Sequence, residues 1–386
     1  MLHWLFILLM AFSEPPLPLF EEQMIDDQVA IGYGLAIGDV DGDGQPDILL
    51  ADKKEFVWYR NGDWKRFVMV DNLTEHDNVC IAARDINGDG RVEVAVGAQW
   101  NPGETNDISQ SGSVHYLIRP DDPTKKWEAV KLHHEPTVHR MRWAKAEKNK
   151  YHLIMLPLHG RGNKGGEGAG VNAIGYEMQD KEGRKWKHWV IDQSMHITHN
   201  LDLVDIGEAD HLYIGGKEGV KSFAFENGKW TNHPNGEWLV DDHGFGEIRI
   251  GKYKNDKKFL TGVEPFHGPN LTFYLQRGDF FSRSNLERNV LSENMNQGHG
   301  LANADLLDLG HDQVVVGWRE PNDNGNLGIK LFVPDESGSW ASHWIDKNGM
   351  ACEDLKVADL NGDGKLDIIA SGRSTKNLKI YWNKTP

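Results

Sequence analysis

Short apolar segments separated by polar turns run along almost the whole chain. Within a segment the apolar residues are continuous or alternate with polar ones at a period of two, and Gly, Asn and Asp bound most segments. This pattern favours β-strands over helices, because a helix repeats its apolar positions every three to four residues. We therefore expect an all-β protein.

The segments recur as one repeating unit. A unit has an inner strand, a polar turn, an apolar strand that ends in Gly, an aromatic-rich strand and an outer strand that often begins with Trp. Repetition of this kind predicts a repeat architecture, whatever domain count the chain length suggests. The expected inner strands lie near residues 35–40, 79–86, 137–143, 199–206, 245–250, 299–306 and 354–360. The outer strands that follow them are expected at 64–71, 127–132, 186–192, 238–241, 281–291 and 340–346.

The pattern gives seven inner strands but only six outer strands after them. The segment 21–27 (EEQMIDD) has the outer-strand pattern and precedes the first inner strand. A chain whose first strand completes its last sheet forms a closed β-propeller, which leaves only short, protected edges. We expect a seven-bladed β-propeller of four-stranded blades over residues 14–386. A β-sandwich or two stacked domains would not explain the offset between the two ends.

Composition agrees with this architecture and excludes several partners. The 386 residues include 42 Gly and 14 Trp, which suits many tight turns and one recurring aromatic in each unit. The net charge of −16 argues against nucleic acid or an anionic membrane surface as a partner. Cys80 and Cys352 are the two cysteines, so disulfides cannot form the framework.

The N-terminal residues resemble a secretory signal. Residues 2–12 (LHWLFILLMAF) form an apolar run too short to span a bilayer, and Ser13 and a Pro-rich stretch follow it, although a basic start is missing. We expect a signal peptide at 1–13 and a periplasmic or secreted protein, or a cytoplasmic one if this segment is not a signal. Later segments are too short for a transmembrane helix, so no membrane span is expected.

One acidic turn occurs three times, as DVDGDGQPD at 39–47, DINGDGRVE at 85–93 and DLNGDGKLD at 359–367. Side chains at its first, third, fifth and ninth positions supply oxygen ligands, which predicts structural Ca²⁺, with Mg²⁺ as the alternative cation. An EF-hand would place Glu at position 12, where this chain has Leu50, Val96 and Ala370 inside apolar strands. The expected ligands are Asp39, Asp41, Asp43, Asp47, Asp85, Asn87, Asp89, Glu93, Asp359, Asn361, Asp363 and Asp367.

Strand direction separates the acidic turns from the candidate chemistry. The loops before the inner strands and after the second strands share one face, and the acidic turns lie on the other. Convergent His, Arg and Trp side chains on the first face are typical of an active site. The catalytic candidates are His139, His159 and His299, followed by His76, His199, His243, His267 and Tyr33. The candidates for substrate binding are Trp100, Arg142, Arg161, Trp318, Arg319 and Glu353.

Two further hypotheses concern this face. The His cluster can bind Zn²⁺, although no tight sequence spacing of the histidines supports a metal site. The loop 157–172 (PLHGRGNKGGEGAGVN) contains six glycines and lacks the spacing of a phosphate-binding loop. We expect it to be a lid over a sugar-sized site, with a plain flexible loop as the alternative.

The acidic turns resemble the FG-GAP/VCBS repeats of β-propellers. More specific segments are HRMRW (139–143), LPLHGRGN (156–163), GHGLANADLL (298–307), QVVVGWR (313–319), GIKLF (328–332), MACEDLKVADLNGDGKLDIIASGR (350–373) and NLKIYWN (377–383). Together they resemble the propeller domain of the aldos-2-ulose dehydratase family, also called 1,5-anhydro-D-fructose dehydratase. The family's fungal enzyme carries cupin domains after the propeller.

This resemblance implies a carbohydrate lyase that eliminates water, or a glycosidic leaving group, from a small keto-sugar. A His would remove the acidic hydrogen next to the ketone. Arg142, Arg161 or Arg319 would stabilise the enolate, and a second His or Tyr33 would protonate the leaving group. Trp100 and Trp318 would stack on the sugar ring.

Two alternatives stay open at this stage. A polysaccharide lyase acting on uronic acids would use similar His and Tyr chemistry, but its acidic substrate would need more basic groups at the mouth. A non-catalytic glycan- or protein-binding propeller would tolerate substitutions in the His-rich rim.

Overall fold

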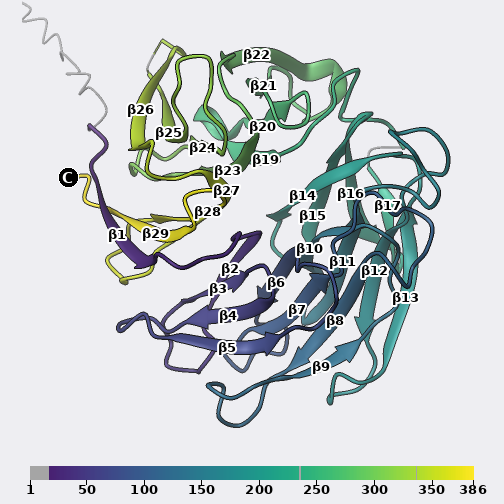
Figure 1. Cartoon of the computed structure of the whole chain (residues 1–386). Helices are drawn as coiled ribbons and strands as arrows, with labels where there is room; N and C mark the ends of the chain where they lie inside the picture. Colours follow the sequence, from purple (N-terminus) through teal and green to yellow (C-terminus); the bar gives the residue numbers. More distant parts are fainter. Residues whose placement is uncertain (1–16, 234–235, 336) are drawn as a thin grey trace, which may run out of the picture.

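The computed structural model describes residues 17–233, 236–335 and 337–386, and within them it is an all-β protein. Seven antiparallel sheets surround a central axis, with the inner strands at the centre and the outer strands at the rim (Figure 1). Two 3₁₀ turns, Lys254–Asp256 and Arg283–Asn285, are the helical elements of the described residues, and none is long and apolar enough to cross a membrane. The predicted seven-bladed propeller is confirmed. The predicted signal peptide at 1–13 lies outside the described residues.

The blades follow one another along the chain. Blade one contains β2 (Gly34–Gly38), β3 (Asp47–Ala51), β4 (Glu55–Tyr59) and β5 (Arg66–Asp71). Blade two contains β6 (Cys80–Arg84), β7 (Glu93–Ala98), β8 (Ser113–Ile118) and β9 (Glu128–Lys131). Blade three contains β10 (Val138–Glu147), β11 (Lys150–Pro157), β12 (Ala173–Met178) and β13 (Trp186–Asp192). Blade four contains β14 (Thr198–Asp205), β15 (Asp210–Gly216), β16 (Gly219–Glu226), β17 (Lys229–Asn232) and β18 (Val240–Asp241).

The last three blades repeat the arrangement. Blade five contains β19 (Ile248–Lys252), β20 (Lys258–Glu264), β21 (Asn270–Gln276) and β22 (Leu286–Ser292). Blade six contains β23 (Gly298–Ala304), β24 (Gln313–Trp318), β25 (Gly328–Pro334) and β26 (Trp340–Lys347). Blade seven contains β27 (Cys352–Ala358), β28 (Asp367–Gly372), β29 (Asn377–Asn383) and β1 (Phe20–Asp26).

The first strand closes the ring as the sequence pattern predicts. Strand β1 pairs antiparallel with β29, from Phe20 opposite Asn383 to Asp26 opposite Leu378. Figure 1 shows the purple N-terminal strand beside the yellow C-terminal one. The ladder of hydrogen bonds between the two ends leaves no unpaired outer edge on β29.

The outer edge of blade four differs from the prediction. Two short strands, β17 and β18, pair with β16 and together form this edge. The expected outer strand at 238–241 corresponds only to the second of them, β18. A two-residue hairpin at Asn227 and Gly228, both with positive φ, returns the chain directly to β17. Asn-Gly is the preferred sequence for that type of turn. The search for an outer strand that begins with Trp therefore overlooked β17, although the Asn-Gly turn before it predicts a hairpin.

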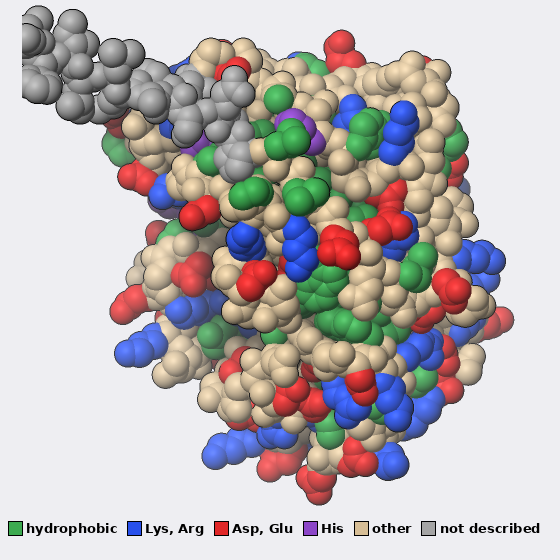
Figure 2. Space-filling view, turned by 90° about the vertical axis from the view of Figure 1, so that its left-hand side faces the viewer, with side chains coloured by type: hydrophobic (Ala, Val, Ile, Leu, Met, Phe, Trp, Pro, Cys, Tyr) green, Lys and Arg blue, Asp and Glu red, His purple; other side chains and the backbone are tan. Residues whose placement is uncertain are grey.

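The hydrophobic core lies between the blades. Seven clusters of buried side chains occupy the seven interfaces between neighbouring sheets, such as Trp58 and Val94 between blades one and two. The sheets pack face to face, so each blade buries both of its faces. Figure 2 shows one flank of the ring, where acidic and basic side chains are intermingled and hydrophobic ones lie between them.

Candidate active site

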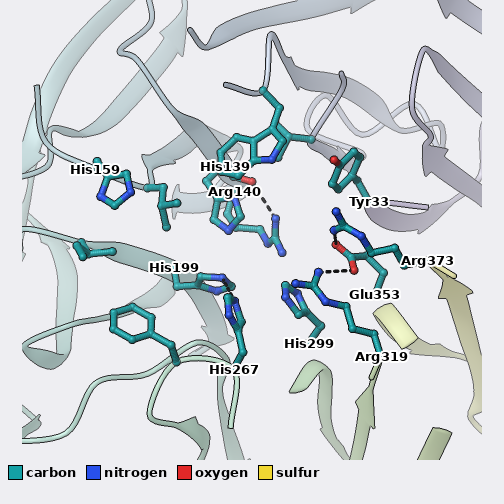
Figure 3. Close-up of a pocket in the computed structure, with 15 residues that line it drawn as sticks. Tyr33, His139, Arg140, His159, His199, His267, His299, Arg319, Glu353 and Arg373 are labelled. Carbon is teal, nitrogen blue, oxygen red and sulfur yellow. Dashed lines mark hydrogen bonds and ion pairs between the residues drawn. The ribbon is translucent and has the colours of Figure 1, made fainter. Parts of the chain in front are cut away.

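A cavity of about 400 Å³ lies at the channel mouth where the inner strands begin. Its walls come from residues just before or at the starts of inner strands and from residues just after second strands (Figure 3). The acidic turns connect β2 to β3, β6 to β7 and β27 to β28 at the opposite ends of the same strands. The lining residues are Tyr33, Val79, Trp100, His139, Arg140, Leu158, His159, Ile197, His199, Phe266, His267, His299, Arg319, Glu353 and Arg373.

Four of these side chains occupy equivalent positions in four blades. His139, His199, His299 and Glu353 each lie one residue after the start of an inner strand, where the register with the second strand shifts by one residue. Such a β-bulge leaves one residue unpaired and redirects its side chain, and bulges are frequent beside active sites. The repeated bulge therefore explains why these four side chains converge on one cavity.

The imidazole rings form a continuous cluster. The His139 ring lies 4.6 Å from that of His199, which lies 4.6 Å from His267, and the His267 ring stacks on His299 at 4.4 Å. One nitrogen from each of His199, His267 and His299 lies within 4.8 Å of the others. Trp100 stacks on the far end of the cluster, 4.9 Å from His139. Three imidazole nitrogens therefore face one point.

Hydrogen bonds define the protonation of two rings. Nδ1 of His199 lies 2.6 Å from the Gly246 carbonyl oxygen, which can only accept, so Nδ1 carries a proton. In neutral His199 the Nε2 atom then carries a lone pair and accepts a hydrogen bond from Nε2 of His267, 2.8 Å away. Both ring nitrogens of His139 and of His299 are buried without a hydrogen-bond partner in the described protein. Buried polar atoms without partners point to a ligand in this cavity.

Burial and positive charge keep the cluster neutral. Burial holds the pKa of His139, His199 and His299 well below the ordinary value for His, and the neighbouring arginines act in the same direction. Burial, with Arg319 and Arg140, lowers the pKa of His267 to about 4. Burial also lowers the pKa of His159. Neutral imidazoles can accept a proton or bind a metal.

A charged network forms the opposite wall. Glu353 is buried and accepts hydrogen bonds from Arg319 at 2.7 Å and from Arg373 at 3.0 Å. Arg373 also lies over the ring of Tyr33, and burial raises the pKa of that phenol, so Tyr33 stays protonated at neutral pH. Arg140 is 8% exposed and extends toward the middle of the cavity, and its guanidinium donates to the carbonyl of His139 at 3.1 Å. Among the described residues no carboxylate lies within ion-pair distance of Arg140, although its charge opposes the burial that raises the pKa of the Glu247 carboxyl.

Nine of the fourteen residues predicted for catalysis or substrate binding line this one cavity. Five lie at or just before the inner strands of blades one, three, four, six and seven, and four lie in loops that follow second strands. They are Tyr33, Trp100, His139, His159, His199, His267, His299, Arg319 and Glu353.

The other five predicted residues lie outside the cavity lining. Trp318 is 1% exposed in the core between blades five and six, and its Nε1 donates to the Asn326 carbonyl, so it cannot stack on a sugar. Arg142 lies further along the channel, near Arg249 and Asp354. Arg161 pairs with Glu135 at 2.9 Å. His76 donates its backbone N–H to Gln99, and His243 lies 4.0 Å from Glu264.

Two charged cavity residues, Arg140 and Arg373, escaped the sequence analysis. Arg373 follows the second strand of blade seven as Arg319 follows that of blade six, so VGWR and ASGR are equivalent segments. Comparing adjacent repeats would have found it. Arg140 was missed in favour of Arg142, because the bulge at His139 changes which strand residues face the mouth.

The His cluster fits a metal ion. Catalytic zinc sites use three protein ligands and leave a fourth position open to substrate. One nitrogen each of His199, His267 and His299 lies within 4.8 Å of the others, and His299 has no competing partner in the described protein. Nε2 of His199 and Nε2 of His267 form a hydrogen-bonded pair, so a metal ion would replace the proton between them. The donor set suits Zn²⁺, as the sequence hypothesis allowed.

The three acidic turns differ in their suitability for a cation. In the first turn, carboxylate oxygens of Asp39, Asp41 and Asp47 lie within 4.8 Å of one another, and burial raises the pKa of Asp47 to about 7. In the second turn, Arg119 lies 3.5 Å from Asp89 and 3.9 Å from Glu93, so a cation would compete with it. In the third turn, the Asn361 amide already donates to Asp363. The first turn is the strongest candidate for Ca²⁺.

The glycine-rich loop 157–172 is tied down at several points. Asn163 is buried and donates to the carbonyls of Ala169 and His196, and Gly162 donates to Thr105. Lys217 reaches the carbonyl of Gly165. These contacts make the loop a fixed wall beside His159, so the structure gives no support to the predicted lid.

The fold and the site define a seven-bladed β-propeller with a His- and Arg-lined cavity at one channel mouth. Residues 34–96 match the model of the FG-GAP-like repeat. Residues 111–277 match the model of the aldos-2-ulose dehydratase β-propeller domain. The resemblance that the sequence segments indicated is therefore confirmed.

Two longer proteins are similar to this chain at low identity. Aldos-2-ulose dehydratase from Phanerodontia chrysosporium is 20% identical over 355 residues, which cover 86% of this chain and 38% of that protein. Integrin alpha-PS2 from Drosophila melanogaster is 21% identical over 272 residues, which cover 65% of this chain and 17% of that protein. The chain thus spans well under half the length of either relative.

The solved structures add only the fold. A chain in the crystal structure of the mitotic checkpoint complex superposes with a TM-score of 0.57 at 11% identity, covering 99% of this chain and 95% of the other. The overlap shows the same propeller architecture. Function does not follow from a shared propeller fold.

Proposed function

We propose that the protein is a carbohydrate lyase that eliminates water or an alcohol from a keto-sugar in the His-lined cavity. The observation that carries this proposal is the convergence of neutral imidazoles with an unpaired guanidinium on one cavity. Elimination next to a ketone needs a base, an oxyanion stabiliser and an acid for the leaving group. The similarity to an aldos-2-ulose dehydratase propeller supports the same reaction class.

His139 and His159 are the proton-transfer residues in this proposal. Both line the cavity, and burial keeps both neutral at physiological pH, which is the form that accepts the α-proton. The Trp100 ring stacks on His139 and holds its plane. Tyr33, whose raised pKa keeps its hydroxyl protonated, donates the proton to the departing oxygen.

Arg140 and the metal site are the electrostatic part of the proposal. The negative charge that develops on the ketone oxygen would lie in a cavity with three arginines and one carboxylate. Arg319 and Arg373 are held by Glu353. By contrast, Arg140 uses one N–H for the His139 carbonyl and has further N–H groups that can donate to the enolate. His199, His267 and His299 would hold a Zn²⁺ ion, which supplies Lewis-acid polarisation of a carbonyl when bound.

The experiment is incubation of the protein with 1,5-anhydrofructose, glucosone and a 3-keto-glycoside. We expect ultraviolet absorbance of a conjugated enone to develop with at least one substrate, and chelator treatment followed by Zn²⁺ addition to remove and restore it. Absence of a new absorbance with all three keto-sugars, with and without Zn²⁺, would contradict the proposal.

One observation favours a second candidate, a lyase for uronic acids. Arg140 has no described carboxylate partner, and a substrate carboxylate would neutralise it. Formation of an unsaturated uronate from a polyuronate, with no reaction of the neutral keto-sugars, would favour this candidate.

A further inference from the structure

A second cavity opens beside the His-lined one, over the junction of blades five and six. It has a volume of about 580 Å³ and shares Phe266 and His267 with the first cavity. Gln297 lines it and accepts a hydrogen bond from Arg319, which lines the first cavity. The two cavities therefore adjoin at Phe266 and His267, and we name the second the side groove.

The walls of the side groove are fixed before any ligand binds. The backbone of Gly298 donates to His267 at 2.7 Å, and that of Met295 donates to Pro269 at 3.1 Å. Asn322 donates to the carbonyl of Asn294 at 3.1 Å, which joins the next loop to the same wall. Preorganised walls reduce the entropy lost on binding.

The chemistry of the side groove matches an uncharged sugar. Carboxamides donate hydrogen bonds to sugar hydroxyl groups and accept them, and carboxylates accept them. Phe266 offers an apolar surface at the junction with the first cavity. The groove-lining residues that carry this argument are Phe266, Glu293, Asn294, Asn296, Gln297 and Asp323.

The charge of the groove lining favours an uncharged sugar over a uronate. Within the described chain the groove lining contains two carboxylates, Glu293 and Asp323, and no Lys or Arg. A polyuronate would place a carboxylate on its second ring beside these two like charges, which is unfavourable. The arginines lie only in the first cavity, where the reacting ring would bind.

We propose that the side groove binds a second, uncharged sugar ring, so that the substrate is a keto-sugar glycoside of at least two rings. The first ring occupies the His-lined cavity, and the second contacts Phe266, Asn296 and Asp323 across the junction. This inference rests on the proposed function for the reaction of the first ring.

The test compares kcat/KM for 3-keto-cellobiose with that for methyl 3-keto-glucoside. Because one or two hydrogen bonds to the second ring are gained, wild type should prefer the two-ring substrate by about tenfold. The substitutions Asp323→Lys and Asn296→Ala should each lower this preference about fivefold. Glu226→Lys is the matched control, since Glu226 is exposed at the end of β16 near the opposite face, and the preference should stay as in wild type. Equal kcat/KM for both substrates in wild type, or an unaltered preference in both groove variants, would overturn the proposal.

A binding measurement separates this proposal from the proposed function. Cellobiose and methyl glucoside cannot react, so calorimetry can measure their binding alone. Cellobiose should bind more tightly than methyl glucoside, and Asp323→Lys should weaken the binding of cellobiose. That result without any turnover would uphold the side groove and overturn the lyase. Turnover of both keto-substrates with no two-ring preference in rate or binding would uphold the lyase and overturn the side groove.

Discussion

Individual side chains at the channel mouth carry the chemistry, and Arg140 is the most informative of them. It is buried, extends toward the middle of the cavity and lacks a described carboxylate partner. In the transition state the enolate oxyanion would provide an anionic partner for its guanidinium. We therefore expect the hydrogen bond from Arg140 to the substrate oxygen to be stronger in the transition state than in the ground state.

Replacement of Arg140 by Gln should lower kcat about 100-fold, the typical loss when one oxyanion donor is removed. KM should change much less, because the interaction forms as charge develops. Steady-state kinetics with the best keto-sugar measure both, and Arg184→Gln, which removes an exposed arginine paired with Glu128, is the control. An Arg140→Gln enzyme with wild-type kcat would contradict the role.

Buried histidines away from the cavity predict how stability depends on pH. His152 is 1% exposed, its Nδ1 accepts a hydrogen bond from Trp230, and burial lowers its pKa to about 4. The unfolded chain, with a pKa near 6.5, then binds one more proton at this site between pH 4 and 6.5. Stability contributed by neutral His152 is present above pH 6.5 and is lost as the pH falls toward 4.

His152→Gln, which keeps an acceptor for Trp230, should remove that proton. Urea unfolding at several pH values should show the slope of unfolding free energy between pH 4 and 6.5 reduced by about 1.4 kcal/mol per pH unit. An unchanged slope would show that His152 does not titrate on unfolding.

At the scale of strands and turns, the repeat explains why much of the site was predictable. Direction and spacing of the segments placed His139, His199 and His299 on one face without any structure. The bulges at those positions have no sequence signature, so Arg142 was chosen where Arg140 lines the cavity. Trp318 was misjudged for a related reason: periodicity cannot tell a rim aromatic from one packed between two blades.

The acidic turns belong to the same scale and predict a calcium effect independent of activity. In the first turn three carboxylates converge and Asp47 is buried, so Ca²⁺ should relieve their repulsion. At a concentration 100-fold above its Kd, Ca²⁺ should add about 2.7 kcal/mol of stability. Thermal unfolding with CaCl₂ or EGTA should differ by a few °C, and Asp41→Asn should reduce that difference. Identical melting in both conditions would exclude a stabilising site.

Across the whole molecule, stability depends on closing the ring through β1. Its side chains tie the two ends together, since Lys379 pairs with Glu22 at 3.0 Å and Trp382 donates to Gln23 at 2.8 Å. A chain lacking the residues up to Asp26 would leave β29 as an exposed edge. We expect a melting temperature lower by roughly 10 °C or more and concentration-dependent aggregation, since several kcal/mol of pairing is lost. Unchanged melting and a monodisperse protein would contradict ring closure by β1.

The central claim for the whole molecule is that its His-lined channel mouth eliminates a leaving group from a keto-sugar. The most direct measurement is the rate of enone formation, followed by ultraviolet absorbance, for wild type and for a His139→Ala/His299→Ala double variant of intact fold. The account predicts steady enone formation by wild type and loss of turnover in the double variant. Equal rates in both proteins would contradict it.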